Sequence, residues 1–233
     1  MPDNALLPSI QRSAAPLRRN VVDALRKAIV EGTLAPGSRL VERELVAMMN
    51  VSRTVIREAL RQLESEGVVE TIPNKGPIVR KLTLAEAKDL YLIRSVLEGL
   101  SARMFVMNAG DAELSRLRER LEETCAAYAG DDPETVLVAK NKFYDVLFSG
   151  AGSDILSSMI GALHARVWRW RALGLHHPQR SKGRSAESVA GLRALMKAIE
   201  ARDADKAEAI ARREVTKAAA EVMRLLQNEG AGG

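Results

Sequence analysis

Several residue types on which functional sites depend are scarce in this sequence. The chain has one cysteine, Cys125, and three histidines among 233 residues. A single cysteine excludes an intramolecular disulfide and any zinc site that is built from several thiolates. There is also no apolar run long enough to span a membrane, and no basic, apolar leader at the N-terminus. We therefore expect a cytoplasmic protein that makes no contact with a membrane.

Signals of catalysis are missing as well. We find no nucleophile and base at matched positions, and no glycine-rich loop of the kind that binds phosphate. An enzyme is therefore not expected. Hydrophobic residues nevertheless make up 46% of the chain, which at this length is enough for two modest cores. We expect two domains.

The positive charge of the chain is concentrated in its first third. Residues 1–82 contain 13 Lys and Arg against 9 Asp and Glu, a net charge of +4, whereas residues 83–233 contain 22 against 21, a net charge of +1. Attraction to the phosphates of a nucleic acid requires such a local excess of cations. The excess is small, so by itself it is weak support for binding to a nucleic acid.

The first third begins with an irregular segment and a helix. Residues 1–16 contain three prolines and no helical period, and we expect a flexible arm there. A helix is predicted over 17–31, because apolar residues recur at helical spacing and Gly32 follows as a stop. We place the first domain at residues 17–81.

Two further short helices follow, over 41–49 and 52–67. Ser52 is a suitable N-cap for the second of them, and Gly67 can supply the positive φ that ends a helix. Only Asn50 and Val51 separate the two helices. Such a join is typical of a helix-turn-helix, whose second helix presents its N-terminal residues to the major groove of DNA.

A β-hairpin is predicted directly after these helices. The β-prone runs 68–71 and 78–80 flank the segment 73–77, which contains two prolines, an asparagine and a glycine. Helix, turn, helix and hairpin in this order favour a winged helix-turn-helix that binds DNA. The alternative is a small helical core with a solvated charged face.

Residues 31–79 carry a family resemblance in addition. The run EGTLAPGSRLVERELVAMMNVSRTVIREALRQLESEGVVETIPNKGPIV resembles the winged-helix signature of GntR-type bacterial transcription regulators. One departure is Val55, where the family usually has proline; proline is favoured at the start of a helix but is replaceable. The resemblance implies DNA contacts by Arg43, Ser52, Arg53, Thr54, Arg57, Lys75 and Gly76.

From residue 83 onward the pattern is almost entirely helical. Thr83 and Glu86 form a predicted capping box, which marks the start of a helix and of the second domain, residues 83–228. We expect six antiparallel helices, the first from residue 83 and the others over 112–129, 133–149, 154–175, 182–201 and 204–228. In the first helix, an apolar series at alternating spacings of three and four predicts a helix-packing seam; its members are Leu90, Ile93, Leu97, Leu100, Met104 and Met107. The predicted fold is thus mainly α, with a winged helix-turn-helix followed by an antiparallel bundle of about six helices.

This second region resembles the FCD effector domain of the FadR-type subgroup of GntR regulators. The resemblance lies in Arg94, Leu97 and Glu98, in Phe143, in residues 150–156, and in Glu187 and Asp203. Many members of that family bind a divalent metal with an Asp or Asn and three histidines on three helices. The matching positions here are Lys140, Tyr144, Ser188 and Glu214. A lysine cation would repel a metal, so we expect no metal and no other cofactor.

The residue pattern independently singles out the same region. Lys140 and Glu214 interrupt apolar series on their helices, and a buried charge is costly alone. We expect the two to face one another across a cavity; the alternative is that both reach solvent. If the cavity survives, it should bind a small organic acid, most simply a carboxylate. The predicted effector-binding residues are Arg94, Lys140, Asn141, Tyr144, Ser188 and Glu214.

Two of these assignments leave alternatives open. Arg94 can equally brace Glu98 or a neighbouring helix. The histidines, His164, His176 and His177, lie at none of the positions that the family uses for metal, and a cap at the end of a helix is the preferred role for the last two.

Together these features predict a DNA-binding transcriptional regulator, by family habit a repressor, that responds to a small organic effector bound in the bundle. We expect a homodimer that reads a short inverted repeat in double-stranded DNA. The alternative function is an effector-free DNA-binding protein whose helical domain serves only dimerisation.

Overall fold

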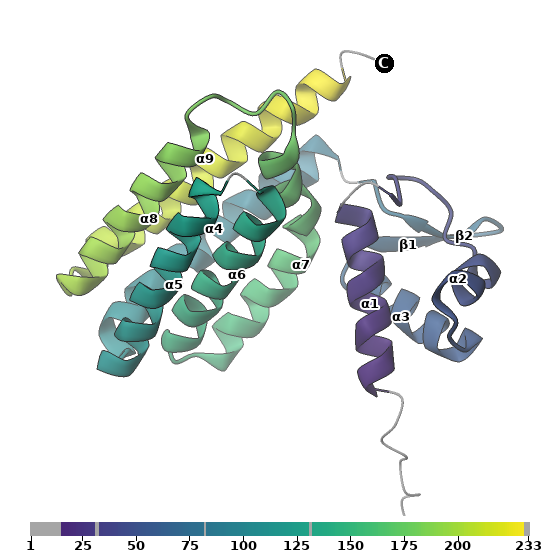
Figure 1. Cartoon of the computed structure of the whole chain (residues 1–233), viewed down its shortest axis with the longest axis horizontal. Coiled ribbons are helices and arrows are strands. Elements are labelled where there is room, and N and C mark those ends of the chain that lie inside the picture. Colours follow the sequence, from purple (N-terminus) through teal and green to yellow (C-terminus); the bar gives the residue numbers. More distant parts are fainter. Residues whose placement is uncertain (1–14, 31–32, 82, 131, 231–233) are drawn as a thin grey trace, which may run out of the picture. The chain divides into compact units, whose positions relative to one another are not determined.

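A computed structural model describes residues 15–30, 33–81, 83–130 and 132–230. The chain divides into two compact units, 1–81 and 82–233. Across the described ranges the structure contains nine helices and one two-stranded sheet, as labelled in Figure 1. The predicted fold class is confirmed. None of the helices is both long and apolar enough to cross a lipid bilayer.

The first unit is a three-helix core with a hairpin. Its elements are α1 (Ala15–Val30), α2 (Glu42–Met49), α3 (Arg53–Ser65), β1 (Val69–Ile72) and β2 (Gly76–Val79). The helices are short, and a single apolar core holds them together. The buried core side chains are Val21, Val22, Leu25, Ile29, Leu40, Leu45, Val55, Ile56, Ala59, Leu60, Leu63, Val69 and Val79.

The expected arm is shorter than the sequence suggests. Helix α1 begins at Ala15 and so includes two residues, Ala15 and Pro16, that we assigned to the arm. Proline is tolerated in the first turn of a helix, where its missing N–H would have no intrahelical partner. The rest of the arm, residues 1–14, lies outside the described residues.

The hairpin is built on residues with positive φ. Strands β1 and β2 are antiparallel, with Ile72 opposite Gly76 and Val69 opposite Val79. Asn74 has a φ of 63° and Gly76 a φ of 83°, conformations that asparagine and glycine adopt at low cost. The chain therefore reverses within Pro73, Asn74 and Lys75, and the hairpin is a short wing.

The second unit is an all-helical bundle. Its helices are α4 (Leu84–Asn108), α5 (Asp111–Ala129), α6 (Pro133–Gly150), α7 (Asp154–His176), α8 (Arg184–Glu200) and α9 (Ala204–Gly230). The predicted capping box is confirmed at the start of α4, where the Glu86 N–H donates to Thr83 Oγ1 at 3.2 Å and the Thr83 N–H donates to Glu86 Oε2 at 2.9 Å. Figure 1 shows α8 and α9 as neighbouring long helices joined by a short turn.

Two apolar clusters fill the bundle. The larger one includes Phe105, Phe143 and Leu195, and the smaller one is built on Tyr91 and Trp170, with Val167 and Val222 beside them. Helix α4 contributes to both clusters, Phe105 near its end and Tyr91 near its start. Between these two positions, α4 buries four polar residues, Arg94, Ser95, Glu98 and Ser101.

Only half of the predicted packing seam on α4 packs within the chain: Leu90, Leu97 and Met104 lie against the apolar clusters. Ile93, Leu100 and Met107 are 48%, 39% and 68% exposed, whereas Arg94 and Glu98 are 4% and 1% exposed. The inward face of α4 holds Tyr91, Arg94, Ser95, Glu98, Ala102 and Phe105. Charged side chains can occupy it because they find partners inside the bundle, which apolar periodicity does not reveal.

Candidate DNA interface and effector cavity

Helix α3 presents polar residues at its N-terminal end and packs its apolar side against the core of the first unit. The Ser52 hydroxyl caps the helix by accepting a hydrogen bond from the Val55 N–H at 3.3 Å. Val55 itself is buried, so the residue that replaces the family's proline contributes to the core. Arg53 and Thr54, the first two residues after this cap, are exposed. The helix therefore offers them to whatever approaches its N-terminus.

The two arginines of this end differ in their surroundings. The Nε of Arg57 donates to both carboxylate oxygens of Glu42, at 2.9 and 3.0 Å, so helix α2 orients the guanidinium. Neither Arg53 nor Arg43 has a hydrogen bond or ion pair to any residue that the structure describes. Both side chains are exposed. Arg53 is therefore free to reach a base edge, whereas Arg57 must either keep or exchange its partner.

The wing presents a cation at its tip. Lys75 is exposed, and its N–H donates to the carbonyl of Ile72 at 3.1 Å to close the turn. A Cβ built on Gly76 would meet only Arg39, whose Nη2 lies 4.0 Å away. Arg39 pairs with Ile78 in an isolated β-bridge. Our sequence reasoning missed Arg39, although it lies just before helix α2 in a turn marked by Pro36 and Gly37.

In the bundle, five of the six predicted effector-binding residues line one small cavity. Arg94, Lys140, Tyr144, Ser188 and Glu214 surround a volume of about 20 Å³. The sixth, Asn141, lines neither this cavity nor the larger one beside it. It lies one residue beyond Lys140 on α6, and about 100° of helical rotation turns it away from the cavity.

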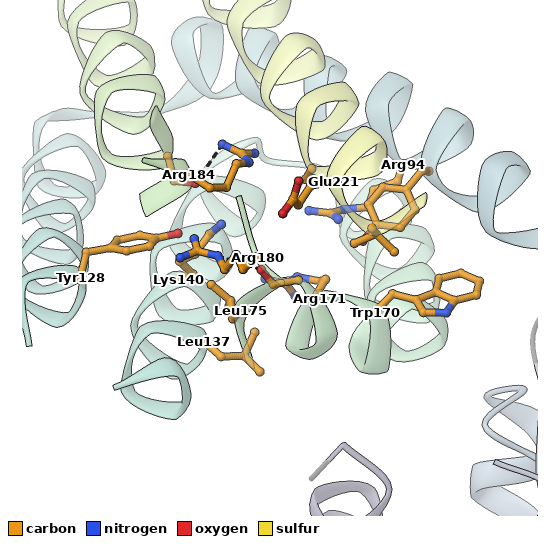
Figure 2. Close-up of a pocket in the computed structure, with 15 residues that line it drawn as sticks. Arg94, Tyr128, Leu137, Lys140, Trp170, Arg171, Leu175, Arg180, Arg184 and Glu221 are labelled. Atoms are coloured by element: carbon orange, nitrogen blue, oxygen red, sulfur yellow. Dashed lines mark hydrogen bonds between the residues drawn. The ribbon is translucent and has the colours of Figure 1, made fainter. Parts of the chain in front are cut away.

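A larger cavity of about 50 Å³ adjoins the first and shares Arg94, Lys140 and Ser188 with it. Figure 2 shows Tyr128 and Lys140 on one side of this cavity, Arg94 and Trp170 on the other, and Arg171 and Glu221 between them. We call the two volumes together the effector cavity. Its lining residues that sequence reasoning missed include Tyr91, Tyr128, Trp170, Arg171, Arg180, Arg184 and Glu221.

Lys140 and Glu214 line the same small cavity, as predicted, but they form no ion pair with each other. Glu214 Oε1 lies 3.2 Å from Lys217 Nζ, one turn further along α9. The Glu214 carboxylate also lies against Gly191 of α8, where a Cβ would come within 2.3 Å of it. Glu214 therefore turns toward a cation of its own helix, and Lys140 is left without a carboxylate partner among the described residues.

Lys140 instead faces an aromatic ring. Its Nζ lies 6.0 Å from the centre of the Tyr128 ring of α5. Burial lowers the pKa of Lys140, and the Arg171 and Arg94 cations lower it further, against the opposing effect of Tyr128. The Tyr128 hydroxyl has no hydrogen-bond partner within the described part of the chain. This side of the cavity therefore combines a cation with a spare hydroxyl group.

A buried ionic layer forms the other side of the cavity. Arg94 Nε donates to Glu98 Oε1 at 2.5 Å. Arg94 thus braces Glu98, which was the alternative to its role in effector binding. His164 Nε2 lies 2.6 Å from the same oxygen, and Arg171 Nη1 lies 3.3 Å from His164 Nδ1. Because a guanidinium only donates, His164 must accept at Nδ1 and donate from Nε2–H to Glu98.

The ionisation of this layer follows from its contacts. Burial alone would raise the pKa of Glu98, but the Arg94 guanidinium and hydrogen bonds from His164 and Arg94 hold it well below its usual range. Burial and the Arg171 cation lower the pKa of His164 to about 4. Glu98 is therefore ionised and His164 neutral at neutral pH. His164 is a structural link and was visible in the sequence only as an isolated histidine.

Several donors of the cavity remain without a partner among the described residues. They are Arg94 Nη1, Arg171 Nη2 and the hydroxyl groups of Tyr91 and Tyr128. A buried polar atom without a partner costs free energy, on the order of 1 to 3 kcal/mol. Water or a ligand with acceptor atoms would remove this cost. The unsatisfied donors therefore give the cavity a preference for anions.

The rim of the cavity is held by contacts with the segment before α8. Glu221 accepts hydrogen bonds from the N–H and hydroxyl of Ser181, both at 2.7 Å, and pairs with Arg224. Arg180 donates to the carbonyl of Gly174 and to Ser185. These contacts tie α7, α8 and α9 together around the opening.

The donor set does not fit the metal that the family resemblance implies. An ammonium, a phenol and a serine hydroxyl stand at three of the four ligand positions, and the fourth, Glu214, is paired with Lys217. Among the described residues no group of three or more His, Cys, Asp or Glu side chains is placed to bind a metal ion. The expectation of no cofactor stays a prediction.

The remaining sequence candidates lie apart from both sites. His177 Nδ1 accepts a hydrogen bond from the Gln179 N–H at 3.0 Å, which stabilises the turn after α7. The side chain of His176 lies outside the described residues. His177 does not line the effector cavity.

Comparisons with known proteins agree with this architecture. Residues 17–79 match the family described as "Bacterial regulatory proteins, gntR family", and residues 89–217, more than half of the chain, match the FCD domain. The chain is 36% identical over 137 residues to the uncharacterized HTH-type transcriptional regulator YdhC of Bacillus subtilis, a match that spans 58% of this chain and 61% of that protein.

A second relative is the HTH-type transcriptional repressor RspR of Escherichia coli, 26% identical over 162 residues, which are 70% of this chain and 71% of that protein. The solved structure of E. coli McbR/YncC covers 91% of this chain and 98% of its own with a TM-score of 0.77, and at 23% identity it shows the fold alone. These families and relatives are transcriptional regulators and not enzymes. The chain therefore belongs to the GntR family of bacterial transcriptional regulators, in the group that carries a C-terminal FCD domain.

Proposed function

We propose that this regulator is a cytoplasmic repressor that binds its operator as a homodimer and responds to a small organic carboxylate in the effector cavity. The proposal of a carboxylate effector rests on one observation, the donors of that cavity that lack a partner. They are Arg94 Nη1, Arg171 Nη2 and two tyrosine hydroxyls, together with the Lys140 ammonium, which has no ion pair. Carboxylates accept from all of these groups. The repressor role rests on family habit and on the similarity to RspR, which is a transcriptional repressor.

The DNA-binding role of single residues follows from their exposure. Arg53 and Arg57 stand at the N-terminal end of α3, where a helix-turn-helix meets base edges, and an arginine there suits the O6 and N7 of guanine. Thr54, Arg43 and Lys75 are suited to phosphate or minor-groove contacts, which position the protein without reading sequence. Ser52 serves through its cap, and Gly76 allows the wing tip to approach the backbone closely.

The exposed apolar face of α4 supports the homodimer. Leu92, Ile93, Val96, Leu100 and Met107 are all more than a third exposed and lie on one side of the helix. Ile155 and Met159, in the first turns of α7, are also exposed, and Asn108 at the end of α4 bonds the carbonyl of Ala151 just before that helix. An apolar surface of this extent favours a protein partner. A second copy related by a two-fold axis would bury it and would match an operator made of an inverted repeat.

An effector regulates DNA binding only if it binds one arrangement of the protein better than another. The cavity is lined by all six helices of the bundle, α4 to α9, at once. A ligand that draws Lys140 and Arg171 together would shift these helices, and α4 is both the cavity wall and the proposed dimer contact. We propose that the effector acts through α4.

The test is a thermal-shift and calorimetric screen of the full-length protein against small carboxylic acids. A ligand that binds only the folded state raises its melting temperature. We expect at least one acid to do so in the wild-type protein and in Lys142→Met, because Lys142 is an exposed lysine on the same helix. In Lys140→Met the shift should be lost or strongly reduced.

A screen in which no acid changes the melting temperature would contradict the proposed effector. It would instead favour the alternative, a DNA-binding protein whose bundle serves only dimerisation. A shift that survives in Lys140→Met would place the ligand outside the effector cavity.

A further inference from the structure

Three cations of the effector cavity, Lys140, Arg171 and Arg180, form no ion pair with a carboxylate among the described residues. Arg180 donates to the Gly174 carbonyl and the Ser185 hydroxyl, which leaves Lys140 and Arg171. Arg94 pairs with Glu98, and Arg184 lies 3.4 Å from Glu187. Glu214 and Glu221, which line the cavity, are engaged by Lys217 and Arg224. Lys140 and Arg171 have no ion pair with any residue that the structure describes.

Both of these cations are withdrawn from solvent. Arg171 is 8% exposed, and among the described residues its hydrogen-bond contact is the neutral His164. Lys140 is half-buried and faces the ring of Tyr128. A buried charge without a counter-ion costs several kcal/mol, on the order found when one partner of a buried pair is removed. Two such charges in one cavity favour a ligand that brings two negative charges.

The two cations belong to different ends of the cavity, each with its own spare donors. At one end, Lys140 of α6 stands with the unpaired hydroxyl of Tyr128 from α5. At the other, Arg171 of α7 stands with Arg94 Nη1 and the Tyr91 hydroxyl of α4. Figure 2 shows these groups arranged around the cavity from Tyr128 to Trp170. A compact anion between Lys140 and Arg94, which both line the smaller volume, would leave Arg171 without a counter-ion, because Arg171 lines only the larger one.

The middle of the cavity is apolar and short. Leu137, Leu175, Ala218 and Val222 line it between the two ends. The larger volume of about 50 Å³ and the smaller one of about 20 Å³ have room for only a few water molecules, each of which needs roughly 10 to 15 Å³. A long or bulky acid would have to displace the wall.

We infer that the effector is a short dicarboxylate, with one carboxylate held by Lys140 and Tyr128 and the other by Arg171 and Arg94. This inference rests on the proposed function, since it names the class of acid that the same cavity binds. In this complex both cations gain a counter-ion, and the unpaired donors gain acceptors. The methylene chain between the carboxylates lies against the apolar middle.

The test compares acids that share a carbon chain and differ in charge. Calorimetric titration of the full-length protein should show that succinate binds about tenfold or more tightly than butyrate, which is the effect of one additional charge-assisted contact. Malonate against propionate is a second matched pair, and inorganic phosphate supplies two charges on one compact group. In Lys140→Met the preference for the dicarboxylate should fall to near unity, whereas Lys140→Arg should keep it.

The outcomes separate the two proposals. If butyrate or phosphate binds as tightly as the dicarboxylates, the inference is overturned but the proposed acid effector stands. If none of these acids binds, both are overturned. Circular dichroism and operator binding of each Lys140 variant show whether a loss of preference comes from the cavity or from misfolding.

Discussion

Arg53 and Arg57 are neighbours on one helix end, yet they enter an encounter with DNA in different states. Arg57 is held by Glu42 of α2, and it must lose this ion pair before it can contact a base. Arg53 has no partner to lose among the described residues. The cost of an exposed ion pair is small, generally below about 1 kcal/mol, so both remain usable, with Arg53 the simpler contact.

Replacing Arg53 by alanine should therefore weaken binding to the specific operator by about 1 to 3 kcal/mol and relax the base preference at one position of each half-site. Arg61→Ala is the matched control, because Arg61 is an exposed arginine two turns further along α3 that pairs with Glu58. Titrations with operator and with unrelated DNA measure both effects. Equal losses on the two DNA molecules would assign Arg53 to phosphate contact.

His164 makes the stability of the bundle depend on pH. Its pKa is about 4 in the folded protein against a usual value of 6.5, so between these pH values the unfolded chain binds more protons than the folded one. Stability must then fall as pH falls from 6.5 to 4. Glu98, whose pKa is also lowered, adds its own loss as it becomes protonated at lower pH.

Replacing His164 by glutamine should remove the first part of this dependence, since glutamine keeps an N–H for Glu98 but does not titrate. Urea unfolding at pH 6.5 and 4.5 should show that the wild-type protein loses more free energy of unfolding than the variant, by on the order of 1 to 3 kcal/mol. His177→Gln, at an exposed turn, is the control. Identical losses in wild type and His164→Gln would mean that His164 is solvated in solution.

At the scale of elements, the two faces of α4 are the reverse of what the burial of apolar residues would predict. Its charged residues, Arg94 and Glu98, point into the bundle, while Ile93, Leu100 and Met107 are exposed. The charged residues can be buried because Glu98 accepts hydrogen bonds from Arg94 and His164, which offset the desolvation of its carboxylate. The outward apolar side chains have no such compensation within the chain, which is why we assign them to a second copy.

The double substitution Ile93→Glu and Leu100→Glu should convert the proposed dimer to a monomer. Each apolar side chain removed from a buried contact costs about 1.5 to 3 kcal/mol, before the cost of placing carboxylates there. Val138→Glu, at an exposed valine on α6, is the control. Sedimentation equilibrium measures the molar mass. A dimer that persists in the double variant would exclude this face as the contact.

At the scale of the whole molecule, the proposed regulation requires that effector and operator affect each other's binding reciprocally. If the acid loosens the hold on DNA by some factor, operator DNA must weaken acid binding by the same factor, typically about 5- to 150-fold. Operator titrations with and without saturating succinate should give that factor, and succinate titrations with and without operator should reproduce it. Acid binding that leaves operator affinity unchanged would separate the cavity from regulation.

Much of this molecule could be read from local sequence patterns. Ser52 and Thr83 predicted helix starts because a cap is a contact between residues a few positions apart. The wing followed from turn residues such as Asn74 and Gly76, and the six helices of the bundle from apolar periodicity. Such features depend on short-range geometry, so the order of residues suffices to find them.

The composition of the effector cavity depended instead on how the helices meet. Lys140 and Glu214 looked like natural partners, but Lys217 lies closer to Glu214, and Lys140 turns to Tyr128. Glu98, His164 and Arg171 lie on two helices that their sequence positions do not connect, and only packing brings them into one ionic layer. A charged side chain takes whichever partner lies within a few ångströms in the folded chain, and that distance is set by tertiary contacts rather than by spacing along the sequence.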